Sequence, residues 1–180
     1  MAKILIHPHP ILRQKAKPVT QFGQKLTQLA NEMLKTIIPD PNDPQGVGLA
    51  ANQIGVLQQI FIMRFPNQKI EVVINPKILK ASSKMLSGLP EKNQYLEGCL
   101  SVPGYYAFVD RPVKIKVIYQ TLTGSLKKKT LNYPYSAYFQ HENDHLNGIL
   151  FIDYVKKSKA QLYLIDPKTK KLKPVKNPFL

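Results

Sequence analysis

Residues 140–146 read Gln140-His141-Glu142-Asn143-Asp144-His145-Leu146. On an α-helix, positions i and i+4 lie on one face, so the two imidazoles could hold one metal ion. Glu142, next to the first histidine, could take a proton from a water bound to that metal. The stretch therefore predicts a metal-binding helix with a carboxylate base. Two histidines that merely flank a glutamate remain the plainer alternative.

The sequence on both sides of this stretch predicts an α+β fold. We expect helices over 21–38, with Thr20 as N-cap, and over 135–146, with Asn147-Gly148 as C-cap. Strands are predicted over the ranges 60–63, 71–76 (ended by Pro76), 113–121 and 127–131, the last two as a hairpin. Asp166-Pro167 and Lys170-Lys171 suggest a turn between short extended segments in the tail. Two helices separated by strand-rich sequence indicate antiparallel or mixed β-sheets packed around the central metal-binding helix.

Length and composition narrow the class of protein. A chain of 180 residues fits one domain, 1–180, with a basic tail over about 156–180. The hydrophobic content of 43% and charged content of 21% exclude general disorder, collagen and coiled coil. The 26 basic against 11 acidic residues give a net charge of +15, which favours polyanionic partners such as nucleic acid.

The single cysteine and the short apolar runs bear on the compartment. Cys99 alone cannot form an internal disulfide, and a lone thiol suits a reducing compartment. No signal peptide is recognisable near the first residues. No apolar run approaches the roughly 18 residues that a membrane span needs. We therefore expect a protein of the cytoplasm or of an organelle interior, with no membrane partner.

Two further segments contribute to the predicted site. A catalytic metal needs a third protein ligand, and no histidine follows His145. Upstream lies Glu97-Gly98-Cys99-Leu100-Ser101, where Cys99 is either a small buried hydrophobe or a thiolate ligand that would suit zinc or ferrous iron. The other segment, 46–55, is rich in small residues that allow close backbone approach, and its Gln53 offers an amide donor.

Together, the three segments resemble the peptide deformylase family. They match its G-x-G-L-A-A-x-Q loop at 46–53, its E-G-C-L-S motif at 97–101 and its Q-H-E-x-D-H-L motif at 140–146. Their order and separation agree with the family, and the resemblance covers about residues 3–155. It implies a metal-dependent hydrolase that removes the N-formyl group from N-formylmethionyl peptides of nascent proteins and releases formate.

The resemblance also assigns roles to the site residues. Cys99, His141 and His145 would hold one divalent metal, commonly Fe²⁺ in this family, with Zn²⁺, Ni²⁺ or Co²⁺ as substitutes. Metal-bound water would be the nucleophile, and Glu142 would be the general base and then the acid. The Gln53 side-chain amide and the Leu100 backbone N–H would stabilise the oxyanion.

A substrate pocket follows partly from helix geometry and partly from the resemblance. Ala137 and Tyr138 precede His141 by four and three residues, so they share its helix face and should wall a pocket beside the metal. The resemblance places Val47 and Tyr95 on the opposite wall. The backbone near Gly48 and Gly98 is expected to bind an extended peptide.

The chain differs from the family pattern at some positions. Tyr106 stands where many members carry arginine, so a charged contact to the substrate is not expected from this position. We expect Arg111 to pair with Glu97 and brace the cysteine segment, the alternative being a solvated surface pair of little energetic value. The lysine-rich tail is a candidate contact for the ribosome surface, with no specific nucleic-acid sequence expected as a partner.

Two other functions fit part of the sequence. A zinc endopeptidase would share the metal-binding helix but predicts a ligand downstream of it, which the sequence does not show. A nucleic-acid-binding module with a structural zinc would explain the net charge. Structural zinc sites, however, usually have four protein ligands, and only three are visible here.

Overall fold

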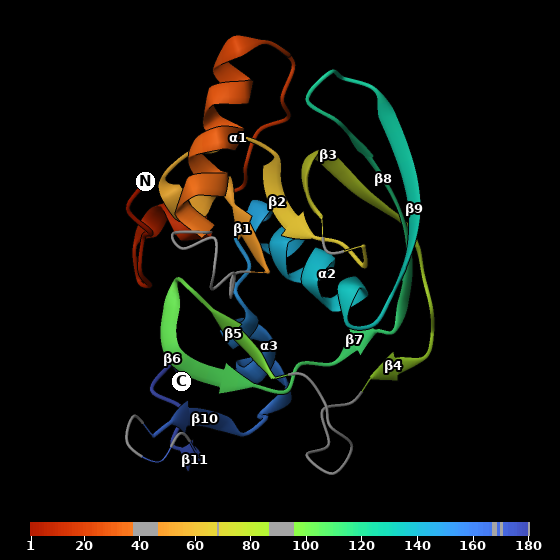
Figure 1. The fold of residues 1–180 in the computed structure, drawn as a ribbon. Helices are drawn as coiled ribbons and strands as arrows, with labels where there is room; N and C mark the ends of the chain where they lie inside the picture. The colour runs from red at the N-terminus through yellow and green to blue at the C-terminus, as the bar shows by residue number, and fades with distance from the viewer. Residues whose placement is uncertain (38–46, 68, 87–95, 167–168, 170, 180) are drawn as a thin grey trace.

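The computed structural model describes residues 1–37, 47–67, 69–86, 96–166, 169 and 171–179. These residues form three α-helices and three antiparallel sheets (Figure 1). The α-helices are α1 (Gln24–Ile37), α2 (Tyr135–Leu146) and α3 (Phe151–Ser158). The short 3₁₀ helices η1 and η2 span Pro10–Arg13 and Ala51–Ile54.

The largest sheet has five strands in the order β1-β2-β3-β8-β9. Its strands are β1 (Gly48–Ala50), β2 (Ile60–Arg64), β3 (Ile70–Ala81), β8 (Lys114–Gln120) and β9 (Leu126–Asn132). The second sheet, in the order β11-β10-β6-β5, contains β11 (Leu172–Val175), β10 (Leu162–Ile165), β6 (Val102–Ala107) and β5 (Glu97–Cys99). A two-stranded sheet pairs β4 (Met85–Leu86) with β7 (Arg111–Pro112).

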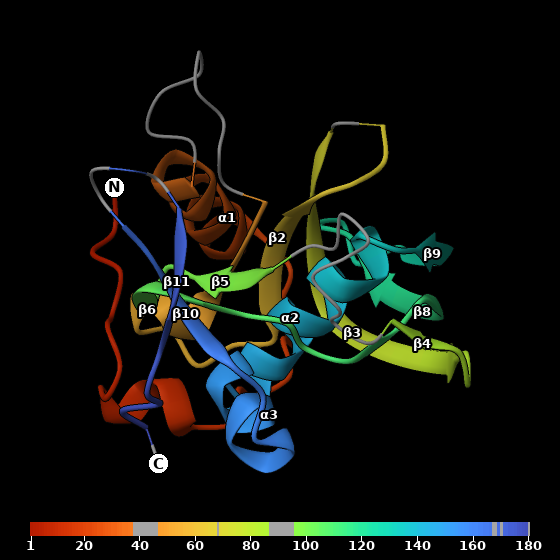
Figure 2. The same ribbon diagram turned by 90° about the horizontal axis from the view of Figure 1, so that it is seen from below.

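Helix α2 lies between the five-stranded sheet and strand β5, with α3 following it along the chain (Figures 1 and 2). Its Phe139 is fully buried and packs edge-to-face on Phe61 of β2, with ring centroids 5.1 Å apart. Val117 of β8 and Leu131 of β9 belong to the same buried cluster. This face of the sheet therefore holds α2, and with it the motif that begins at His141, in a rigid core.

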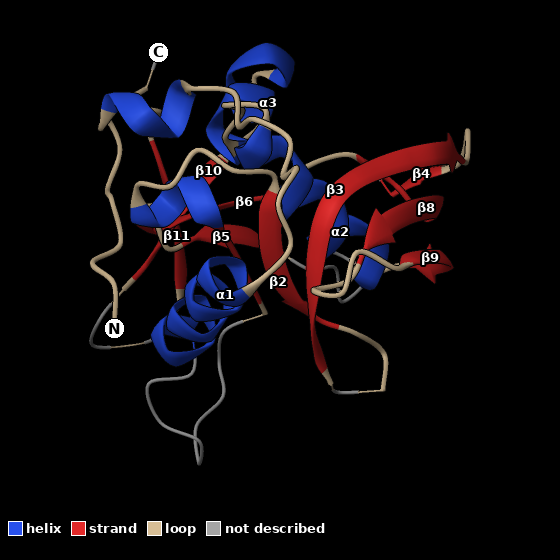
Figure 3. Cartoon of the chain, turned by 90° about the horizontal axis from the view of Figure 1, so that it is seen from above, coloured by secondary structure: helices blue, strands red, loops and turns tan. Residues whose placement is uncertain are grey.

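Helix α1 covers the opposite face of the same sheet, but only at one end. Leu26, Ala30 and Met33 pack in one buried cluster with Leu49 of β1 and Ile62 of β2. Figures 1 and 3 show α1 beside β2 and well away from β8 and β9. A third buried cluster joins α3 to the four-stranded sheet. Among the described residues, no helix is long and apolar enough to cross a membrane.

The α+β fold with antiparallel sheets is as predicted. The helix over 135–146 has the expected bounds, with C-cap Asn147 and Gly148 at φ +73°. The hairpin is also confirmed, as β8 and β9 pair from Lys114↔Asn132 to Gln120↔Leu126. The short extended segments predicted in the tail are confirmed as the paired strands β10 and β11, while Pro167 and Lys170 of the predicted turn lie outside the described residues.

Two predicted details were wrong, and one helix was missed. Helix α1 begins at Gln24 rather than beside Thr20, consistent with the low helix propensity of the intervening Gly23. Residue 38 lies outside the described residues. Pro76 does not end its strand: β3 continues to Ala81 through a register shift between Ile74 and Lys77, where a missing proline N–H is tolerated. The short helix α3 was not predicted at all.

Candidate active site

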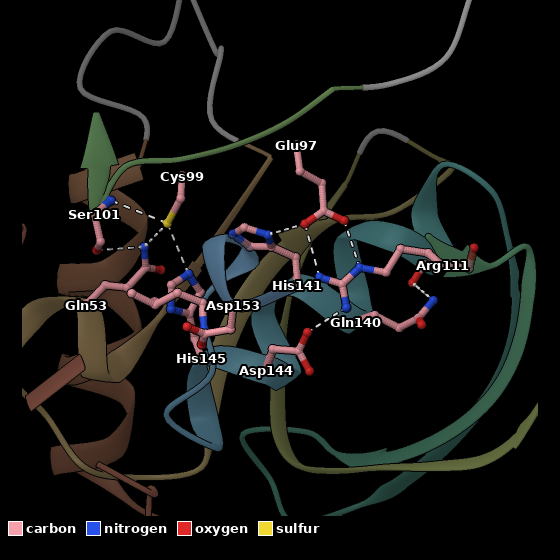
Figure 4. A network of polar contacts seen from close by, with 12 residues as sticks. Gln53, Glu97, Cys99, Ser101, Arg111, Gln140, His141, Asp144, His145 and Asp153 are labelled. Carbon is pink, nitrogen blue, oxygen red and sulfur yellow. Dashed lines mark hydrogen bonds and ion pairs between the residues drawn. The ribbon is translucent and has the colours of Figure 1, made fainter. Parts of the chain in front are cut away.

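The two histidines of the motif meet Cys99 at the contact between α2 and β5. His141 and His145 lie one turn apart on α2, and Cys99 is the last residue of β5. One ligand atom from each of the three residues lies within 4.8 Å of the others. The Cys99 Sγ and His145 Nε2 atoms are 3.2 Å apart (Figure 4).

The orientation of the rings suits a shared ion. His141 donates from Nδ1 to Glu97 Oε2 at 2.9 Å, which leaves its Nε2 for a ligand. A thiolate with two imidazoles is a donor set that zinc and ferrous iron accept, and three protein ligands leave a position for water. The residues present therefore fit a catalytic metal ion.

Behind His141 lies a buried network of charges. Arg111 of β7 donates to both oxygens of Glu97 and, from Nη1, to Asp144 Oδ2 at 2.5 Å (Figure 4). The expected pairing of Arg111 with Glu97 is confirmed. Each side chain is only 4% exposed, so the alternative of a solvated surface pair was wrong. Burial alone would raise the pKa of Glu97, but the Arg111 guanidinium and the His141 hydrogen bond lower it to about 2. Glu97 is therefore a permanent anion that orients the His141 ring.

Glu142 points into the site from α2 and has little room. It is buried, and no described residue donates a hydrogen bond to its Oε2. Burial is the main cause that raises its pKa to about 7. A Cβ added to Gly48 would lie 2.3 Å from Glu142 Oε1, so only glycine at this position allows the carboxylate to sit here.

Gln53 presents its amide nitrogen to the cluster. Its Oε1 accepts from the Ala50 backbone N–H at 2.8 Å, which fixes which way the amide faces. Its Nε2 donates to Ser101 Oγ at 3.2 Å and lies 3.6 Å from Cys99 Sγ. Ser101 also donates its backbone N–H to Cys99 Sγ at 3.4 Å, a role that no prediction gave it.

Asn52 and Asp144 are further residues that sequence reasoning missed. The buried Asn52 donates from Nδ2 to the backbone carbonyl of His145, and so ties η2 to α2. Asp144 binds Arg111 from inside the motif. Asn52 lies in the 46–55 segment and Asp144 in the 140–146 segment, but their hydrogen-bond partners are distant in sequence. Their place in these motifs was therefore the only sequence signal that could have identified them as site residues.

A cavity of about 810 Å³ opens onto this cluster. Of the six residues predicted to bind substrate, five line it: Val47, Gly48, Gly98, Ala137 and Tyr138. Tyr95 lies outside the described residues. Leu100 also lines the cavity, and the residue is 45% exposed.

Comparisons with known proteins agree with this geometry. The family described as polypeptide deformylase matches residues 1–161. The chain belongs to this family. It is 40% identical over 163 residues to the peptide deformylase of Thermotoga neapolitana, covering 90% of this chain and 92% of that one. The Rhizobium meliloti peptide deformylase is 38% identical over 165 residues, covering 89% and 88%.

Solved deformylase structures have the same fold. The crystal structure of the Thermotoga maritima peptide deformylase matches with a TM-score of 0.77 at 38% identity, covering 86% of this chain and 97% of that chain. The peptide deformylase of Thermus thermophilus also gives 0.77 at 38% identity, covering 88% of each chain. The chain is therefore an enzyme of the deformylase family.

Tyr106 occupies a distinctive place in this deformylase site. It pairs with Gly98 across β5 and β6 and lines the cavity. A Cβ on Gly98 would lie 2.5 Å from the Tyr106 ring, so the ring lies directly on the glycine. An aromatic ring thus packs on the backbone of β5 beside the cavity.

Proposed function

We propose that this enzyme hydrolyses the N-formyl group of N-formylmethionyl peptides of nascent proteins and releases formate. The observation that carries the proposal is the cluster of Cys99, His141 and His145 beside the buried Glu142, at the wall of a cavity. Membership of the deformylase family supports the same reaction.

Cys99, His141 and His145 are the proposed ligands of one divalent metal ion. We favour Fe²⁺ as the native ion, with Zn²⁺, Ni²⁺ or Co²⁺ as alternatives, because all accept mixed sulfur and imidazole ligands. When bound, such an ion makes a coordinated water acidic and polarises a carbonyl oxygen. Glu97, held by Arg111, keeps the His141 ring oriented toward the ion.

Glu142 is the proposed general base and acid. From its buried position it takes a proton from the attacking water and delivers it to the leaving amine. Gln53 Nε2 and the Leu100 backbone N–H are the proposed donors to the oxyanion that develops at the formyl oxygen when water attacks the formyl carbon. The hydrogen bond from Ala50 to Gln53 Oε1 supports this role, because it aims the NH₂ group at the cluster.

The cavity is the proposed binding site for the methionine side chain. Its proposed walls are Val47, Tyr95, Ala137 and Tyr138. Gly48 at the start of β1 and Gly98 in β5 would offer backbone groups to an extended peptide, as in strand addition. A flexible, unbranched apolar side chain suits such a pocket.

The test compares a formyl-Met peptide with its unformylated twin, using the metal-loaded enzyme. We expect formate release from the first and no cleavage of the second. Cleavage of an internal peptide bond would instead favour an endopeptidase.

A Glu142→Gln variant tests the base. It should retain its metal content and lose about 10²–10⁴-fold in kcat, while Glu32→Gln on the exposed face of α1 serves as the matched control. Full activity of Glu142→Gln would exclude Glu142 as the base. Loss of turnover with the metal retained would exclude a purely structural zinc.

We also propose that the enzyme acts in the cytoplasm, as its bacterial relatives suggest, and that its basic tail (156–180) contacts the ribosome surface. Lys173 of the tail pairs with Asp166. The other described tail lysines, 156, 157, 159, 171 and 176, are exposed. Replacing them with glutamine should weaken co-sedimentation with ribosomes at low salt. Unchanged co-sedimentation would leave the tail as a merely solubilising surface.

A further inference from the structure

One face of the five-stranded sheet is only half covered. Among the described residues, helix α2 packs along the inner face through β2, β8 and β9. On the outer face, α1 shares a buried cluster with β1, β2 and Ile74 in the first half of β3, and no described helix covers the rest (Figures 1 and 3). Strand residues alternate between the two faces, so the uncovered part can be derived from the pairing register. It lies over the second half of β3 and most of β8 and β9.

This uncovered area carries lysines from three neighbouring strands. Residues that pair directly across neighbouring strands share a face. Val117 and Ile115 of β8 are buried on the inner face, so their neighbours along the strand point to the outer face. The rows on that outer face are Lys77↔Ile118↔Lys128, Lys80↔Lys116↔Thr130 and Lys114↔Asn132. The five lysines are exposed. We call these five residues the lysine face: Lys77, Lys80, Lys114, Lys116 and Lys128.

The charge of the lysine face is not balanced by the described residues. Glu71 pairs with Lys127 and Lys129, whose register places them on the inner face instead. No ion pair among the described residues involves a member of the lysine face. Lys80 and Lys116 even stand directly opposite each other, an arrangement of like charges that destabilises a sheet. Such an arrangement is relieved by an anionic partner.

The shape of the lysine face selects among polyanions. The lysines extend over three strands, with neighbouring strands about 5 Å apart and same-face residues of one strand about 7 Å apart. This two-dimensional spread can contact two phosphate backbones at once. The described part of this face carries no aromatic side chain to stack on an unpaired base, which disfavours a single strand. Its apolar side chains are the half-buried Ile118 and the exposed Leu126, which pairs with Gln120 at the end of this face, whereas a membrane surface would need a broader apolar area.

We propose that the lysine face binds the phosphate backbone of double-helical RNA, without reading base sequence. The choice of RNA over DNA rests on the proposed function, since nascent chains are made on particles built largely of folded RNA. The cavity opens beside His141 and Ala137 on α2, and α2 packs on the opposite side of the sheet. RNA and a peptide can therefore bind at the same time.

The test measures binding of the metal-loaded, full-length enzyme to a synthetic RNA duplex of about 20 base pairs at several salt concentrations. The variant Lys77→Gln/Lys116→Gln/Lys128→Gln should bind at least about tenfold more weakly, and its slope of log K against log[salt] should fall by about 3. A matched control, Lys15→Gln/Lys25→Gln/Lys35→Gln, removes the same charge from exposed lysines elsewhere and should bind nearly as wild type does.

Hydrolysis of a free formyl-Met peptide by all three proteins shows that they are folded, and it should be unchanged. Equal losses in both variants would mean that net charge alone attracts RNA, and would overturn the proposal. The proposal would also be overturned if RNA binding were lost only on replacing the tail lysines 157, 171 and 176. Tighter binding to a single strand, to duplex DNA or to vesicles of anionic lipid than to the RNA duplex would overturn it as well. Because binding needs no turnover, it can succeed or fail independently of the proposed reaction.

Discussion

Arg111 binds both oxygens of the Glu97 carboxylate, from Nε to Oε1 at 2.7 Å and from Nη2 to Oε2 at 3.0 Å. The same guanidinium reaches Asp144 on α2, so one cation neutralises two buried or nearly buried anions. The Arg111 Cζ atom also lies 4.5 Å from the centroid of the Tyr154 ring on α3. Arg111 thus connects β7, β5, α2 and α3 behind the cluster of Cys99, His141 and His145.

Removal of this cation should be severe. We expect Arg111→Met to lower the free energy of unfolding by about 3–5 kcal/mol, because Glu97 and Asp144 would remain buried without a counter-charge. Urea denaturation measures the loss. Arg13→Met is the control, since Arg13 pairs with the exposed Asp153 and should cost about 1 kcal/mol or less.

The Arg111–Glu97 pair should also affect the metal. Glu97→Gln removes the anion that orients His141, and we expect metal affinity to fall about 10–100-fold. In the double variant with Arg111→Met, the losses of metal affinity should be clearly smaller than their sum, because each residue acts through the other. Additive losses in equilibrium dialysis would count against bracing by this pair.

A methyl group at Gly48 should impair turnover more than folding. The added Cβ would lie 2.3 Å from Glu142 Oε1, so Gly48→Ala must displace the carboxylate. We expect kcat to fall about 10²-fold, as a displaced catalytic group does, with a stability loss of about 1–3 kcal/mol. Gly23→Ala is the control, because nothing lies within 4 Å of its added Cβ. Wild-type kcat in Gly48→Ala would show that Glu142 can move without cost.

Alanine substitutions at two glycines with positive φ can separate the energetic cost of backbone strain from that of steric overlap. Gly148 at φ +73° would place a Cβ 2.4 Å from the Arg13 carbonyl oxygen, whereas Gly124 at φ +79° would place it 3.7 Å from the Phe22 ring. Alanine at either position should cost about 1 kcal/mol for the backbone conformation. Gly148→Ala should cost at least about 1 kcal/mol more than Gly124→Ala in thermal or urea unfolding. Equal losses of stability in the two variants would mean that the backbone around Arg13 can move away from the added methyl group at no cost.

Glu71 should make stability depend on pH. Burial alone would raise its pKa, but hydrogen bonds from Lys129 and Tyr119 lower it below the ordinary value of 4.5. The folded protein therefore holds this proton less tightly than the unfolded chain, so the stabilisation is complete above pH 4.5 and is lost as the pH falls through the lowered pKa.

The variant Glu71→Gln should consequently be less stable than wild type by about 1 kcal/mol near pH 7, with the difference shrinking below about pH 4.5. Urea unfolding at several pH values measures it. Asp110→Asn changes the same charge at an exposed position and is the control. A difference that stays constant down to about pH 3 would contradict the assignment.

Local patterns predicted a large part of the molecule. The spacing of His141 and His145 fixed their common face on α2, and alternation in 113–121 fixed which side chains of β8 are buried. Both patterns express backbone geometry within a few residues, so they survive whatever the chain packs against. The continuation of β3 beyond Pro76 was missed because a bulge accommodates the proline. Helix α3 was missed although Phe151, Ile152 and Val155 recur at helical spacing, because eight residues give only a short periodic signal.

By itself, the sequence determined the fold class, the helix that carries His141 and His145 on one face, and the residues that the three motifs share with the family. Only the tertiary structure decided that Arg111 binds Asp144 as well as Glu97, that Gly48 makes room for Glu142, and that five lysines gather on one uncovered sheet face. The physical reason is how far apart along the chain the interacting residues lie. Periodicity is set by neighbours along the chain, whereas these contacts join distant segments whose positions depend on burying the apolar faces of helices and sheets together.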